Sequence, residues 1–107
     1  MGQRADLQVL LRGILETVNV AFVNNVYFQP PATVTMVYPC IVYRRDYAYT
    51  EFANDKPYKY CKRYLVTVID QNPDSEIPGK IAALPMCIFD RFYTANQLNH
   101  DVYKLFF

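Results

Sequence analysis

The sequence predicts an α+β fold in which a mainly antiparallel sheet of four to five strands packs against two helices. Three observations support this: an apolar stripe at helical spacing near the N-terminus, strand-like segments in hairpin order, and ten Tyr and seven Phe without Trp. Aromatic residues favour sheets. Strands in hairpins with one helical crossover are typical of α+β folds, not of an alternating β-α series. A length of 107 residues suits one domain, over 1–107.

Two segments carry helix signals. Residues 5–18 place apolar side chains three and four positions apart, on one helical face. Gly13 lies inside this helix at a cost of about 1 kcal/mol relative to Ala, so we expect a neighbouring segment to approach closely there. The second helix is expected to begin near Asp74 or Ser75, because capping side chains precede it and Pro78 is tolerated only in the first turn.

Five segments have strand character, and the strands are expected at 26–28, 34–44, 58–70, 86–93 and 100–107. Pro39 has no amide hydrogen, so its strand is predicted to be an edge, to bulge there, or to face that position away from a neighbour. Residues 45–57 show neither a helical nor a strand period and end in turn-forming residues. They are expected to form a long loop or a loosely extended hairpin tip. Residues 94–99 are expected to join the last two strands.

Composition excludes several classes of protein. Eleven Lys and Arg against ten Asp and Glu give a formal charge of +1, so no global field attracts nucleic acid or a membrane. No apolar run approaches the roughly 20 residues that span a bilayer, and the N-terminus lacks a signal-peptide layout. Cys40, Cys61 and Cys87 are odd in number and far apart, which indicates reduced thiols. We expect a soluble intracellular domain.

Few residues suggest a catalytic, metal-binding or phosphate-binding site. His100 is the single histidine, and its neighbour Asp101 is expected on the opposite face of the strand. A nucleophilic pair of His100 with a cysteine is formally open, but a reduced, buried cysteine is the stronger interpretation. Structural zinc sites use close cysteine pairs, and the sequence has none. Three glycines also leave no glycine-rich phosphate loop.

Acidic residues gather at Asp70, Asp74 and Glu76, where a cation or an acid–base pair would find ligands. Capping of the helix that follows explains the same residues without a site. We therefore expect no enzyme activity, no metal and no cofactor.

Charge is uneven along the chain. Residues 44–63 contain six Lys or Arg against three Asp or Glu, an excess of three positive charges, whereas the rest has five against seven. The same segment is rich in Tyr. This mixture is suited to stacking on single-stranded nucleic acid but also to protein interfaces, which the small net charge favours. A short domain cannot easily bury so many aromatic rings alone. The candidate interface residues are Arg45, Tyr47, Tyr49, Phe52, Lys56 and Lys59.

Several runs resemble small tail-completion proteins of long-tailed bacteriophages, the tail-terminator and head-to-tail joining proteins of the phage neck. These runs are Tyr38-Pro39-Cys40-Ile41-Val42-Tyr43, Lys62-Arg63-Tyr64-Leu65-Val66-Thr67-Val68-Ile69-Asp70, Asn72-Pro73-Asp74-Ser75-Glu76-Ile77-Pro78, Phe89-Asp90-Arg91 and Asn99-His100-Asp101, followed by an aromatic tail. The order and spacing of the runs carry the resemblance, which covers nearly the whole chain.

The resemblance implies a virion protein without an active site. Such proteins form a homo-oligomeric ring, typically hexameric, that caps the tail tube, stops its polymerisation and meets the connector and adaptor proteins of the head. It also implies assembly in the host cytoplasm and a position around a DNA channel. The basic residues from Lys56 to Arg63 are candidates to face DNA, and salt bridges between subunits explain them equally well. A head-side connector or stopper protein and, less strongly, a nucleic-acid-binding module remain as alternatives.

Overall fold

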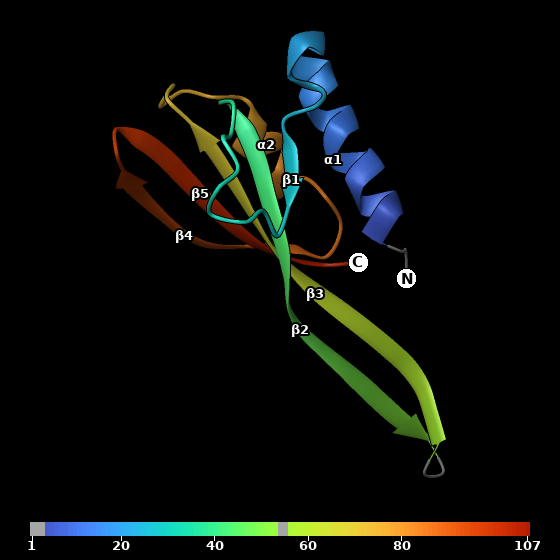
Figure 1. Ribbon diagram of the computed structural model, residues 1–107. Coiled ribbons are helices and arrows are strands. Elements are labelled where there is room, and N and C mark those ends of the chain that lie inside the picture. The colour runs from blue at the N-terminus through green and yellow to red at the C-terminus, as the bar shows by residue number, and fades with distance from the viewer. Residues whose placement is uncertain (1–3, 54–55) are drawn as a thin grey trace.

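The computed structural model describes the backbone of residues 4–53 and 56–107, and the side chains of residues 4–48 and 62–107. The elements, shown in Figure 1, are α1 (Arg4–Val18), the 3-10 helix η1 (Val20–Phe22), β1 (Val26–Phe28), β2 (Cys40–Ala53), β3 (Lys56–Asp70), α2 (Ile77–Ala82), β4 (Cys87–Ala95) and β5 (Leu98–Phe106). The strands form one sheet in the order β1-β2-β3-β5-β4. β1 runs parallel to β2, and the other neighbours are antiparallel. The fold is α+β, as predicted.

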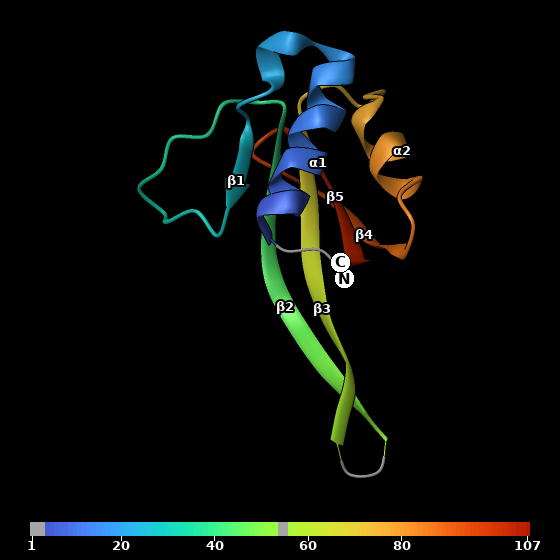
Figure 2. The same ribbon diagram turned by 90° about the vertical axis from the view of Figure 1, so that its right-hand side faces the viewer.

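Both α-helices cover the same face of the sheet (Figure 2). Buried residues of the two helices meet inward-facing residues of β1, β2, β3 and β5 in one core, which consists of Leu7, Leu11, Leu15, Val26, Ile41, Tyr43, Tyr64, Val66, Val68, Ile77, Ile81, Tyr103 and Leu105. Full burial of each such side chain contributes about 1.5–3 kcal/mol. Strand β4 adds no buried residue to this core.

The hydroxyl of Tyr43 fastens α1 to the sheet from inside the core. Tyr43 is fully buried, and its hydroxyl donates to Oε1 of Gln8 while accepting from Nη1 of Arg4 at 3.3 Å. Nε2 of Gln8 in turn donates to the carbonyl of Val26 at 3.3 Å. A buried polar group is costly unless it is hydrogen-bonded, so these bonds fix where α1 sits against β1 and β2.

The hairpin of β2 and β3 is longer than predicted. The strand expected over 34–44 begins at Cys40, because Pro39 before it has no amide hydrogen for a ladder, and it continues to Ala53. The described part of 45–57 belongs to β2 and β3. The long loop is therefore wrong, and the extended hairpin tip is the correct one of the two expectations.

Two irregularities hide the strand period in this segment. The register between β2 and β3 shifts between Arg45 and Tyr47, and again between Glu51 and Phe52. A bulge inserts one residue and exchanges the two faces of the strand beyond it. A two-residue alternation cannot be recognised across such points, although the backbone remains extended.

The turn between β4 and β5 is also tighter than predicted. The strands end at Ala95 and resume at Leu98, so 94–99 is not a loop of six residues. Asn96 and Gln97 have φ angles of 52° and 64°. Two left-handed residues are the signature of a two-residue hairpin turn whose twist matches that of the strands. Asn is a common residue in such turns and Gln is not, which explains the missed signal.

Helix α2 begins at Ile77, not at Asp74 or Ser75. The expected capping side chains instead close turns before the helix. Oδ1 of Asn72 accepts from the amide of Asp74 at 3.0 Å, and Oγ of Ser75 accepts from the amide of Ile77 at 3.3 Å. Pro78 does lie in the first turn, as expected, where its missing amide hydrogen is harmless.

The expected close approach at Gly13 is wrong, since a Cβ atom there would have no neighbour within 4 Å. Gly13→Ala should therefore raise the free energy of unfolding by about 0.5–1 kcal/mol, because Ala removes backbone freedom from the unfolded chain without a clash. Urea denaturation measures this. Gly13→Ser is the control and should gain less, because Ser is a poorer helix former. A loss of stability in Gly13→Ala would show that the position is not open.

Candidate assembly surfaces

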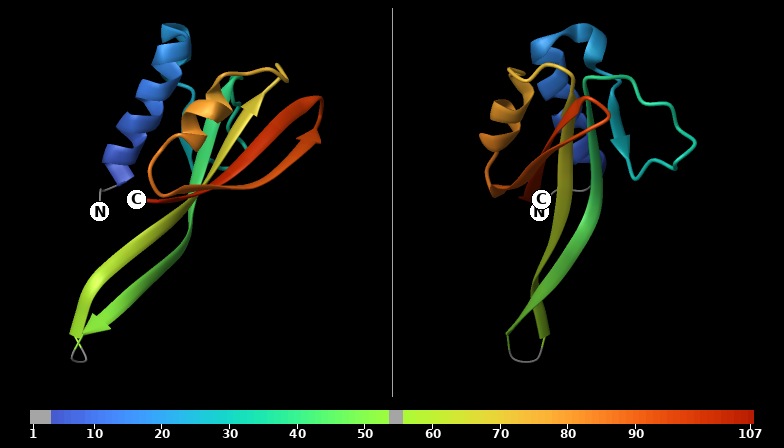
Figure 3. Two further views of the ribbon diagram at one scale, coloured as in Figure 1. Left: turned by 180° about the vertical axis from the view of Figure 1, so that it is seen from behind. Right: turned by 90° about the vertical axis from the view of Figure 1, so that its left-hand side faces the viewer.

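The outer part of the β2–β3 hairpin projects away from the rest of the molecule (Figures 1 and 3). β5 pairs with β3 only from Arg63 to Asp70 in the described sheet, whereas β2 and β3 pair along the whole hairpin. We call residues 46–53 and 56–62, which lie beyond the ladder with β5, the arm. The arm accounts for the elongated shape of the molecule, whose principal extents are 51, 29 and 26 Å.

A charged clamp holds the two strands together at the base of the arm. Nε and Nη2 of Arg63 donate to the two carboxylate oxygens of Asp46 at 3.1 and 3.2 Å. The guanidinium carbon also lies 4.9 Å from the centre of the Tyr47 ring. Bidentate Arg–carboxylate pairs have a defined geometry, and a cation over an aromatic ring adds attraction. The clamp sits at the first register shift, where the ladder with β5 ends.

All six predicted interface residues lie on the arm or at its base. Arg45 is exposed, and Tyr47 has 51% of its surface exposed. The other four, Tyr49, Phe52, Lys56 and Lys59, are placed on the arm by their backbone, and their side chains lie outside the described residues. The candidate residues, spread over 15 positions of sequence, thus belong to one structural feature.

Strand β4 carries a second candidate surface. It is an edge strand of the sheet, and large apolar side chains on it or just before it are exposed: Met86, Ile88, Phe89, Phe92 and Tyr93, which we call the β4 edge patch. Phe89 and Phe92 pair in register with Tyr103 and Asp101, whereas Ile88 and Tyr93 pair with Lys104 and His100. Because alternate residues of a strand face opposite ways, the patch occupies both faces of the sheet.

The β4 edge patch was not predicted from the sequence. Residues 86–93 are apolar except for Asp90 and Arg91 and show no clear alternation, a composition that is also typical of a strand covered on both faces. Edge strands are normally protected by charge or by a covering segment. The strand order was needed to reveal that this run lies at the border of the sheet.

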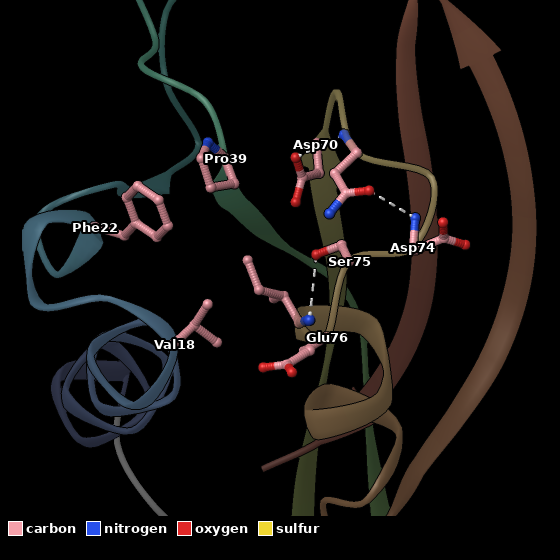
Figure 4. A pocket seen from close by; sticks show the side chains of 9 residues that line it. Val18, Phe22, Pro39, Asp70, Asp74, Ser75 and Glu76 are labelled. Atoms are coloured by element: carbon pink, nitrogen blue, oxygen red, sulfur yellow. Dashed lines mark hydrogen bonds between the residues drawn. The ribbon is translucent and has the colours of Figure 1, made fainter.

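The acidic residues border a cavity of about 370 Å³ beside the turn between β3 and α2. Figure 4 shows that the carboxylates of Asp70, Asp74 and Glu76 point in different directions and do not converge. Oδ1 of Asp70 accepts from the amide of Asn72 at 3.0 Å, a bond that closes the turn. Among the described residues, no group of three or more His, Cys, Asp or Glu is placed to hold a metal ion. The arrangement favours a structural role for these acids.

The cysteines that the structure describes are not paired with the histidine. Cys40 and His100 are both register partners of Ile69, so two strand spacings, about 10 Å, separate them. Burial raises the pKa of the Cys40 thiol to about 12, and burial also raises the pKa of Cys87. A nucleophilic cysteine needs a thiolate, which these environments disfavour. The side chain of Cys61 lies outside the described residues.

Comparison of the sequence with protein-family models and with curated proteins finds no match in either. Within residues 4–53 and 56–107, no helix is long and apolar enough to cross a membrane.

Cys40 should resist alkylation in the folded protein. Its side chain is fully buried, and a pKa raised from 9.0 to about 12 lowers the thiolate fraction at pH 8 by roughly a thousandfold. Iodoacetamide labelling followed by peptide mass spectrometry should find Cys40 modified far more slowly than Cys87. The control is the same reaction in urea, where the three cysteines should react alike. Equal labelling of Cys40 and Cys87 in the folded state would contradict the described environment.

Arg63→Ala should loosen the arm and leave the body of the sheet intact, because the clamp with Asp46 lies outside the core. Hydrogen–deuterium exchange should then become faster for the amides of 47–62 but not for those of 64–70. Arg91→Ala serves as the control, since its ion pair with Asp90 is long, at 3.8 Å. Unchanged exchange in the arm would show that the clamp does not hold it.

Proposed function

We propose that this chain is a structural protein of the tail neck of a long-tailed bacteriophage. Its copies form a ring, six in the family that the sequence resembles, which caps the tail tube, stops tube polymerisation and joins the tube to the connector and adaptor proteins of the head. The protein is assembled in the host cytoplasm and resides in the virion, where DNA passes through the ring. The role is assembly, with no catalytic step and no cofactor.

The arm is the observation that carries this proposal. A two-stranded hairpin without further cover is marginally stable in water at best. This arm extends eight residues along β2 beyond the ladder with β5, and residues 46–62 include four Tyr and one Phe. Tyr and other aromatic residues are enriched in protein interfaces. An arm of this kind is best explained as a segment that is covered by another subunit or another neck protein.

The β4 edge patch supports assembly independently. A ring is built from heterologous contacts, in which two different surfaces of the subunit meet around a closed rotation. The arm and the β4 edge patch are two such surfaces, formed by different strands of the sheet. A protein that acts alone has little use for either, because exposed apolar patches are normally interaction sites or aggregation hazards.

Substitution of Tyr47, Tyr49 and Phe52 together by Ser should leave a folded monomer that no longer assembles, because the aromatic surface of the arm is lost. Light scattering measures the mass in solution, electron microscopy shows rings, and circular dichroism checks the fold. Val9, Val20 and Val37, also apolar and exposed on other elements, are changed to Ser as the matched control and should assemble normally. If the arm variant formed rings as readily as the wild type, the aromatic residues of the arm would not belong to the assembly surface.

The tail-tube protein of the same phage distinguishes the alternatives. Tubes polymerised with this protein should stop lengthening and carry a ring at one end. Binding to head connector proteins without any effect on tubes would favour the connector or stopper alternative. Filter binding to single-stranded DNA at two salt concentrations tests the nucleic-acid-binding module, whose affinity would fall steeply with salt. Tubes that grow unchanged would overturn the tail-terminator role.

A further inference from the structure

We infer that the arm of one copy lies along the β4 edge of the next copy, where the outer part of its β2 adds a sixth strand to the neighbour's sheet. This inference rests on the proposed function, because it names the contact by which the ring is built. The exposure of β4, the unpaired edge of the arm and the placement of both in the molecule support this contact.

The β4 edge patch points to a partner beside the strand, not above it. A partner resting on one face of the sheet would cover Phe89 and Phe92, or else Ile88 and Tyr93, but not both pairs. A strand hydrogen-bonded along the edge sends alternate side chains to both faces. It therefore covers both pairs at once while it satisfies the outward amides and carbonyls of β4. This is the recognition mode of strand addition.

The outer part of β2 has the properties of such a strand. β1 pairs with β2 only at Ile41–Tyr43 in the described sheet, so the other side of β2 is unpaired by any strand along 46–53. Eight residues there span about 27 Å and the nine residues of β4 about 30 Å, so the lengths match. Residues 46–53 contain no proline, whereas the β3 side of the arm carries Pro57, which interrupts a ladder.

The partner must be another copy because the arm cannot reach β4 in its own molecule. Figures 1 and 3 show that the arm leaves the sheet on the side away from β4. A contact between two arms would leave the β4 edge patch of each copy exposed, whereas a head-to-tail contact covers both surfaces and can repeat around a closed ring.

Two opposite variants test the contact. In the first, residues 49–61 are replaced by Asn-Gly, which joins the register partners Ala48 and Lys62 by a two-residue turn. In the second, Phe92→Lys and Tyr93→Lys place charge on the edge patch. The matched control for the second is Val20→Lys with Val37→Lys, at residues that are 68% and 58% exposed on other segments. Circular dichroism and thermal melting confirm that each variant is folded, and native mass spectrometry with light scattering reports its assembly.

The two variants are also mixed, because the arm-to-β4 contact predicts a specific result for the mixture. Each variant alone should be monomeric, or associate at least about tenfold more weakly than the wild type, and the control should match the wild type. An equimolar mixture should form a heterodimer and no larger species. The β4 variant supplies the only intact arm, and the arm-shortened variant supplies the only intact β4 edge. A pairing of two β4 edges would instead let the arm-shortened variant dimerise alone, which would overturn the inference.

The outcomes also separate this inference from the proposed function. Rings formed by the β4 variant as readily as by the wild type would refute the arm-to-β4 contact and leave the neck function in place. A wild type that stays monomeric up to roughly 1 mM would likewise overturn the contact between copies, although a monomer that still stops tube growth would retain the capping role. A mixture that remains monomeric while the wild type assembles would also refute it.

Discussion

The mismatch in length between β3 and β5 is the constraint on which the rest of the molecule depends. β3 has 15 residues and β5 has nine, so the pairing of β3 with β5 ends at Arg63 while the β2–β3 hairpin continues. Up to Arg63, the helices cover one face of the sheet, and the hydrogen bond between Tyr43 and Gln8 attaches α1 to it. Beyond Arg63, β2 and β3 pair only with each other in the described sheet. The core lies in the body of the sheet, and the two-stranded ribbon by itself is marginally stable at best.

The elements of the body could be predicted because each carries a local signal. The leucines of α1 repeat with helical spacing, and 58–70 alternates as a strand over a core should. The arm could not be predicted as regular strand, because the shift after Arg45 interrupts the alternation of β2 and the shift after Glu51 interrupts that of β3. The starts of β5 and α2 differ from the prediction because of two turns. Gln97 adopts a left-handed conformation that glutamine seldom takes, and Ser75, a common helix-capping residue, closes a turn before the helix instead.

The arm residues were identifiable as candidates because aromatic and basic residues in one aperiodic stretch are conspicuous in composition. The β4 edge patch was not, since Ile88, Phe89 and Phe92 have the composition of a buried strand and only the strand order places them at a border. Edge position depends on pairings between residues far apart in the chain, and a single sequence holds no direct record of them. A pair of Cys40 with His100 is excluded on the same ground, because Ile69 of the strand between them separates the two residues.

The register shift in β4 has a consequence for the newly made protein. The ladder with β5 is irregular between Phe89 and Arg91, and the carboxylate of Asp90 lies 3.7 Å from Nζ of Lys104. The border of the sheet is therefore bent near the middle of β4 and carries charge there, so a strand that pairs along it must accommodate both. Such interruptions are how natural sheets avoid fibrous aggregation. The kink at Asp90 therefore limits unspecific strand pairing along an edge that carries large exposed apolar side chains.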